Sequence, residues 1–154
     1  MEKLKLGWRE WMNIPFLGIP YIKAKIDTGA RTSALHATKM RVVRRGGVRF
    51  IRFHTYPIQK NNNVVVECMA PMVDRRYVTD SGGAKELRYI IKIPLQLNGK
   101  SWEAEVSLTN RKKMRFRMLL GRTALKNCVV HPDQSYLCGK VLKSKLKKGY
   151  PTWS

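Results

Sequence analysis

The chain has 154 residues, 44% of them hydrophobic, so it is long enough to bury the core of one globular domain and too short for two full lobes. Lys and Arg number 31 against 10 Asp and Glu, and the formal net charge of +21 favours anionic partners such as nucleic acid, acidic peptides or anionic lipid. No apolar run is long enough for a membrane span, and three cysteines without Cys-x-x-Cys spacing exclude a disulfide framework and a zinc cluster of that kind.

Short strands separated by turn residues follow one another along the chain. The first is predicted over residues 4–12. Residues 17–20 are predicted to form a tight connection into the second, which ends at Asp27. Gly46-Gly47 and Asn98-Gly99 are each predicted to join two strands, because these residues accept the positive φ of a tight hairpin turn. Further strands are expected at residues 35–37, 40–44, 48–54, 64–69, 87–97, 100–109, 114–120 and 129–137.

Two segments are predicted to be other than strands. Residues 56–63 are expected to form an exposed loop, and residues 122–126 the only short helix. The pattern predicts an all-β fold: a closed barrel of six or more strands with one short helix. Residues 1–139 would form this single domain, and residues 140–154 a basic C-terminal tail.

The stretch around Asp27 is the main candidate for chemistry. A strand of alternating apolar and basic residues runs directly into Asp27-Thr28-Gly29, which presents a carboxylate at a tight loop. Glycine lets backbone amides approach the carboxylate, and the hydroxyl of Ser33 is a candidate to bind its outer oxygen. The same three residues also end many ordinary strands in turns, so the loop alone favours a turn.

A second element far downstream strengthens the functional interpretation. Ala30 follows the Asp-Thr-Gly triplet, and an apolar strand enters Gly121-Arg122. Asp-Thr-Gly-Ala together with a later apolar-apolar-Gly-Arg element resembles retropepsin-like aspartic peptidases. The resemblance implies that Asp27, Thr28 and Gly29 are catalytic, and that Ala30, Ser33, Gly121 and Arg122 support them.

Residues 70–86 are predicted to form a mobile hairpin, or flap, over the cleft. The flap and substrate-binding residues would be Thr79, Asp80, Ser81, Gly82 and Gly83, together with Arg31 in the cleft. A peptidase of this kind needs two carboxylates that share one proton. The chain is too short for two lobes, so a homodimer is expected to bring two copies of Asp27 together. An alternative pairs Asp27 with Asp80, since Asp80-Ser81-Gly82 also fits an Asp-Ser/Thr-Gly triplet.

Most of the chain is similar to one bacterial and archaeal family. This family was long labelled as ATP-dependent zinc proteases, is associated with the enzyme that adds glutamates to a ribosomal protein, and is now regarded as retropepsin-like aspartic endopeptidases. The matching segments are residues 6–11, 18–37, 78–83, 108–111 and 117–122. The zinc and ATP labels gain nothing from the residues, because His36, His54 and His131 are scattered and there is no Gly-x-x-x-x-Gly-Lys-Ser/Thr loop. No metal or other cofactor is predicted.

Arg31 is a departure from the viral pattern, in which an acidic residue at this position often pairs with the arginine of the Gly-Arg element. Arg122 therefore needs another partner, and Arg31 is expected to favour acidic substrate side chains. The sequence thus predicts an aspartic endopeptidase acting on acidic peptides or protein tails, in the cytoplasm, or in the periplasm if a signal peptide has been removed. The alternative is a basic β-barrel that binds RNA or a ribosomal surface without catalysis.

Overall fold

The computed structural model describes residues 2–79 and 82–153. Its strands are β1 (Leu4–Gly7), β2 (Arg9–Ile14), β3 (Ile19–Ile26), β4 (Ser33–His36), β5 (Thr38–Arg45), β6 (Val48–Thr55), β7 (Val66–Thr79), β8 (Lys85–Leu97), β9 (Lys100–Thr109), β10 (Met118–Leu120) and β11 (Cys128–His131). The helical elements are two 3₁₀ turns, η1 (Pro15–Leu17) and η2 (Arg122–Ala124), and the α-helix α1 (Lys143–Gly149). The predicted predominance of β-structure is confirmed.

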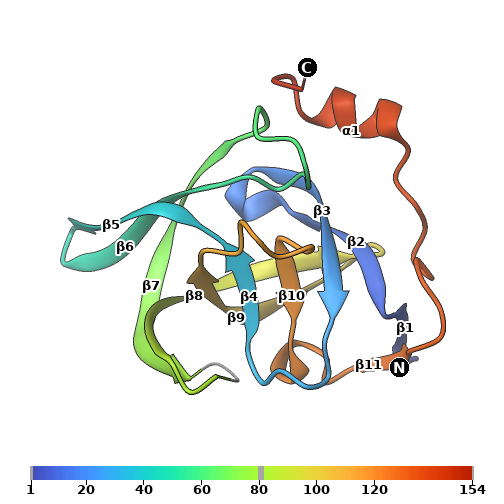
Figure 1. The fold of residues 1–154 in the computed structure, drawn as a ribbon, viewed down its shortest axis with the longest axis horizontal. Coiled ribbons are helices and arrows are strands. Elements are labelled where there is room, and N and C mark those ends of the chain that lie inside the picture. The colour runs from blue at the N-terminus through green and yellow to red at the C-terminus, as the bar shows by residue number, and fades with distance from the viewer. Residues whose placement is uncertain (1, 80–81, 154) are drawn as a thin grey trace.

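Nine strands form one sheet in the order β2-β3-β10-β4-β9-β8-β7-β6-β5, while β1 pairs in parallel with β11 (Figure 1). One further pair, Asn13 with Gln96, links β2 to β8. Closure of the sheet into a barrel stays a prediction. Strand β10 is parallel to β3 and antiparallel to β4, so the chain leaving β3, the chain leaving β10 and the chain entering β4 meet at one end of these strands.

The core is built by strands whose buried and outward side chains alternate. In β8, Ile93, Leu95 and Leu97 are buried while Pro94 and Gln96 between them are only partly so. Complete burial of an aliphatic side chain of this size contributes about 1.5–3 kcal/mol. The turn from β8 to β9 forms as predicted, with Asn98 and Gly99 at φ 51° and 76°.

Several sequence predictions of secondary structure are wrong. The strand predicted over residues 114–120 is limited to β10, Met118–Leu120, and the strand predicted over residues 129–137 is limited to β11, Cys128–His131. The strand predicted over residues 4–12 is two strands that bend at Trp8, because β1 pairs with β11 whereas β2 pairs with β3. The helix predicted at residues 122–126 is the short 3₁₀ turn η2, and the α-helix lies instead in the segment predicted as a basic tail.

Helix α1 is held by a second, smaller apolar cluster. Its Leu146 and the following Tyr150 are buried against Ile58 and Val64. Ile58 lies in the loop predicted to be exposed, and its side chain is only 6% exposed. This part of the loop is buried because the C-terminal helix packs against it.

Strands β5 and β6 form a hairpin that extends outward from the rest of the sheet, at the left of Figure 1. Strand β5 is the last strand of the sheet and pairs only with β6. As for membrane insertion, the described residues include no helix with the length and apolar character that crossing a bilayer requires.

Candidate active site

Asp27 follows directly after β3 and is half-buried. Its backbone amide donates to the carbonyl of Leu120 at 2.8 Å, which ties the loop to the end of β10. One carboxylate oxygen, Oδ1, accepts the amide of Gly29 at 2.9 Å. A Cβ on residue 29 would lie 3.1 Å from that oxygen, so glycine leaves the carboxylate room. Thr28 and Gly29 are exposed beside it.

Gly121 is the residue against which the loop is packed. A Cβ at this position would lie 2.8 Å from the carbonyl carbon of Thr32 and 2.9 Å from the carbonyl oxygen of Ala30. Both are backbone atoms, which cannot move aside as a flexible side chain would. The next two amides complete the contact, with Arg122 donating to Ala30 at 2.8 Å and Thr123 to Arg31 at 3.1 Å. The two sequence elements singled out in the motif analysis are therefore brought together through their backbones.

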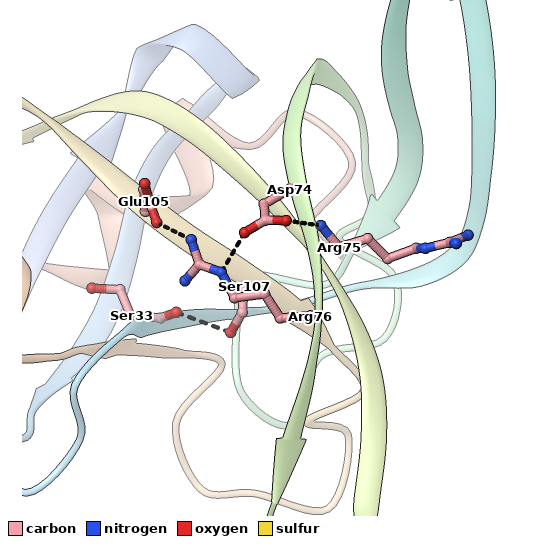
Figure 2. A network of polar contacts seen from close by, with 6 residues as sticks. All are labelled: Ser33, Asp74, Arg75, Arg76, Glu105 and Ser107. Atoms are coloured by element: carbon pink, nitrogen blue, oxygen red, sulfur yellow. Dashed lines mark hydrogen bonds and ion pairs between the residues drawn. The ribbon is translucent and has the colours of Figure 1, made fainter.

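Ser33 is fully buried, and its hydroxyl accepts the Gly121 amide at 3.1 Å. Its carbonyl accepts the hydroxyl of Ser107 at 3.0 Å, as Figure 2 shows. The sequence analysis expected this hydroxyl to bind the outer oxygen of Asp27. In the structure this hydroxyl instead accepts the Gly121 amide, so Ser33 supports the loop through Gly121.

Arg122 meets the expectation that it needs a partner other than an acidic side chain. Its guanidinium Nη1 donates to the carbonyl of Thr28 at 3.1 Å. Arg31 is exposed and forms no ion pair with any of residues 2–79 and 82–153. Its cationic head is therefore available beside the loop.

The predicted flap corresponds to the far end of the β7–β8 hairpin, where Thr79 pairs with Lys85. Thr79, Gly82 and Gly83 are exposed, and Gly83 has a φ of 87°. Asp80 and Ser81 lie outside the described residues, so the alternative pairing of Asp80 with Asp27 stays a hypothesis.

His36 is the last residue of β4, the strand that follows the Asp27 loop. It is 1% exposed, and its Nδ1 accepts the amide of Arg111 at 2.8 Å. Burial lowers the pKa of His36 to about 4, and the charges of Arg117, Arg111 and Lys112 act in the same direction. The imidazole is therefore neutral at pH 7.

Two arginines from the segment between β9 and β10 are buried, and neither forms an ion pair with a carboxylate of residues 2–79 or 82–153. Arg111 is 9% exposed and donates through Nε to the carbonyl of Phe116 at 3.0 Å, and Arg117 is 6% exposed. Among the described residues, Nε and Nη1 of Arg117 have no hydrogen-bond partner. Burial lowers the pKa of both guanidinium groups, and for Arg111 the nearby charge of Asp27 acts in the opposite direction. Of the two, the Arg111 guanidinium is the one whose charge acts on Asp27.

Arg76 lies on β7. Figure 2 shows its guanidinium between two carboxylates, with Nε donating to Asp74 and Nη2 to Glu105, each at 2.6 Å. The hydrogen bond from Arg76 lowers the pKa of the Asp74 carboxyl. Arg75 directs its guanidinium away from this group. Arg76 is therefore occupied within the fold, whereas Arg75 joins the cluster only through its backbone amide, which donates to Asp74 at 2.7 Å.

A remaining question is whether a metal could occupy the site. The described residues contain no group of three or more His, Cys, Asp or Glu side chains that could hold a metal ion.

The comparison with known families matches residues 5–140 to the RimB-like family, described as retropepsin-like aspartic endopeptidase RimB. The chain belongs to the RimB-like family. This confirms the family resemblance drawn from the Asp27 and Gly121 elements, which lie within the matched residues. Helix α1 lies beyond them.

Curated relatives of this RimB-like chain are named as ligases. It is 43% identical over 140 residues to "Probable alpha-L-glutamate ligase" of Shewanella pealeana, covering 90% of this chain and 31% of that protein. It is 40% identical over 151 residues to the protein of the same name from Desulfotalea psychrophila, covering 97% and 32%. The chain thus spans about a third of the length of these relatives.

A solved structure has the same fold. The crystal structure of Lpg0085 from Legionella pneumophila, a protein of unknown function, matches the RimB-like chain with a TM-score of 0.73 and 24% sequence identity. The match covers 88% of this chain and 98% of the other.

Proposed function

We propose that the chain is an aspartic endopeptidase in which the Asp27 carboxylates of two copies activate a water molecule. The observation that carries the proposal is the way the Asp27 loop is held. Leu120 fixes its backbone and Gly29 fixes one carboxylate oxygen, while the side chain stays half-exposed. Thr28 and Gly29 are exposed next to it, which leaves a face for a second copy. Membership of the RimB-like family supports the same activity.

The chemistry needs one proton shared between two carboxylates, because like charges this close cannot both ionise. The ionised Asp27 takes a proton from water as the water oxygen attacks the peptide carbonyl carbon, and the protonated partner gives its proton to the carbonyl oxygen. When the tetrahedral intermediate collapses, the Asp27 that took the proton from water gives it to the nitrogen, and the other Asp27 takes back a proton from one of the two hydroxyls. The C–N bond then breaks and the amine leaves, with one proton again shared by the pair.

The charge around the site supports acidic substrates. Arg31 is exposed beside the loop without an ion pair to the described residues, and the Arg111 guanidinium is close enough to Asp27 for their charges to interact. The relatives' name, alpha-L-glutamate ligase, indicates that their longer chains form bonds to glutamate. A peptidase related to part of such a protein would meet glutamate-containing chains, whose carboxylates fit arginine in a bidentate geometry.

The test is cleavage of two matched peptides, one rich in Glu and one with Gln at the same positions, followed by mass spectrometry. Asp27→Asn keeps the shape of the side chain and removes its ability to ionise, so we expect it to abolish cleavage. Asp133→Asn removes an exposed carboxylate on the turn after β11 and serves as the matched control. Arg31→Ala is expected to weaken binding of the Glu-rich peptide several-fold, since an exposed pair contributes about 0.2–1 kcal/mol and a desolvated one more.

The outcomes separate mechanism from specificity. Full cleavage by Asp27→Asn would refute the aspartic mechanism. Absence of cleavage by the unmodified protein would favour the alternative of a non-catalytic basic protein. Equal binding of the Glu-rich and Gln-rich peptides would leave the mechanism standing and refute the acidic substrate. Sedimentation that finds only a monomer under conditions of full activity would exclude the homodimeric pair.

A further inference from the structure

The hairpin formed by β5 and β6, residues 38–55, is a second basic feature, which we call the arm. It extends away from the sheet in Figure 1 and turns back at Gly46-Gly47. Strand β6 pairs with β7 only from Phe50 to Thr55, so the outer part of the arm is a two-stranded ribbon. None of its residues has a part in the proposed peptidase.

The arm carries an unbroken excess of positive charge. Residues 38–55 contain no Asp or Glu. Its cationic side chains are all exposed, and none forms an ion pair with any of residues 2–79 and 82–153. They are Lys39, Arg41, Arg44, Arg45, Arg49 and Arg52. Only the half-buried His54, near the inner end of the arm, lies beside a carboxylate, that of Glu67 at 3.4 Å.

The register places like charges directly opposite each other. Arg41 pairs with Arg52, and Arg44 pairs with Arg49. Such cross-strand pairs repel each other and destabilise a sheet. Charged side chains on an edge strand are commonly a protection against aggregation, which would account for the arginines of β5. Protection of an edge strand does not account for Arg52, because Arg52 lies where β6 is already paired with a strand on each side.

The arginines lie on both faces of the ribbon. Because successive residues of a strand point to opposite faces, Arg41 and its neighbour Arg52 lie on one face, and Arg44 with Arg49 on the other. A partner that offers anionic groups on two sides would neutralise both sets. The major groove of a B-form DNA duplex does this, since it is wide enough for a two-stranded β-ribbon and has phosphates along both walls.

The arm lacks the features of a single-strand binder. Bases of single strands stack on exposed aromatic side chains, and in the arm Phe50 is half-buried while Phe53 is buried. We propose that the arm binds duplex nucleic acid through its phosphate backbone. This function goes beyond the proposed peptidase and does not depend on it.

The test measures fluorescence anisotropy of a labelled 20-base-pair duplex of mixed sequence, as DNA and as RNA, over a range of salt concentrations. The arm variant replaces Arg41, Arg44, Arg49 and Arg52 with Gln. The control variant removes the same number of charges from exposed lysines in and around α1, namely Lys143, Lys145, Lys147 and Lys148. Thermal unfolding checks that both variants fold, and the pair Arg44→Gln with Arg49→Gln provides a smaller change at the arm's outer end.

We expect the arm variant to bind at least about tenfold more weakly than the control variant, since phosphate contacts dominate affinity. Its salt slope on DNA should fall by up to about 3.6, because each phosphate contact contributes about 0.9. Whichever duplex the protein binds more tightly, DNA or RNA, identifies the source of the phosphates. Equal losses of duplex affinity in the arm variant and in the control variant would refute binding through the arm. So would displacement of the duplex by a Glu-rich peptide or by anionic vesicles at the same charge concentration, because the partner would then be an acidic protein or a membrane.

Discussion

Acidification should destabilise the fold through His36. The buried imidazole has a pKa lowered from 6.5 to about 4, so the folded chain resists a proton that the unfolded chain accepts. Stability is therefore complete above pH 6.5 and is lost as the pH falls from 6.5 towards 4. The difference between 6.5 and 4 is about 2.5 pKa units, and at 1.36 kcal/mol for each unit the full loss is about 3 kcal/mol. At pH 5 the loss from this residue is about 2 kcal/mol.

Urea unfolding at pH 7 and pH 5 measures this loss. The comparison variant is His36→Asn, whose amide oxygen can still accept the Arg111 amide that Nδ1 accepts now. Asparagine does not titrate, so the variant should be less stable than the parent at pH 7 but should lose about 2 kcal/mol less on going to pH 5. If parent and variant lose equal free energy between the two pH values, the burial of a neutral His36 is not the cause.

Two further substitutions test the supports of the fold and of the loop. Gly121→Ala places a Cβ 2.8 Å from backbone atoms, so urea unfolding should show a loss of unfolding free energy at or above the upper end of about 1–3 kcal/mol. Gly29→Ala is the control. Its nearest contact is the Asp27 side chain, so it should leave the unfolding free energy nearly unchanged. Equal losses of unfolding free energy in Gly121→Ala and Gly29→Ala would contradict the close backbone contact at Gly121. The carboxylate of Glu10 is fully buried and accepts hydrogen bonds from three backbone amides, those of Gly7, Leu137 and Cys138. Glu10→Gln replaces it with a neutral amide and should lower the unfolding free energy by about 1–3 kcal/mol. The half-exposed Glu105→Gln is the control and should cost no more than about 1 kcal/mol.

Much of the sheet could be predicted because its signals are local. Asn98-Gly99 fixes the β8–β9 turn through two residues that accept positive φ, and alternating side chains identify the strands on either side. The parallel pairing of β1 with β11 has no such signal, since it joins segments from the two ends of the fold. Helix α1 was missed for a related reason. Its single buried residue, Leu146, gives no helical period, and its partners Ile58 and Val64 lie far away in sequence.

The candidate site divides in the same way. Asp27 and Gly121 could be found because both belong to short motifs, and the contact between them needs only backbone atoms and a glycine. Two hydrogen bonds could not be predicted, because neither leaves a pattern in the sequence. The Gly121 amide donates one to Ser33, and the Arg111 amide donates the other to the buried His36. The same holds for the two buried arginines, which look like any other residues of an exposed basic segment.

The contact between Gly121 and the Asp27 loop also sets the order in which the protein can become competent during synthesis. Asp27 is translated 94 residues before Gly121 (121 minus 27), and until then its loop lacks both the Leu120 carbonyl and the glycine against which it packs. At about 5–20 residues per second, this interval lasts roughly 5 to 20 seconds. A nascent chain that already carries Asp27-Thr28-Gly29 therefore lacks the contacts that hold this loop, and a chain that ends before residue 121 never gains them.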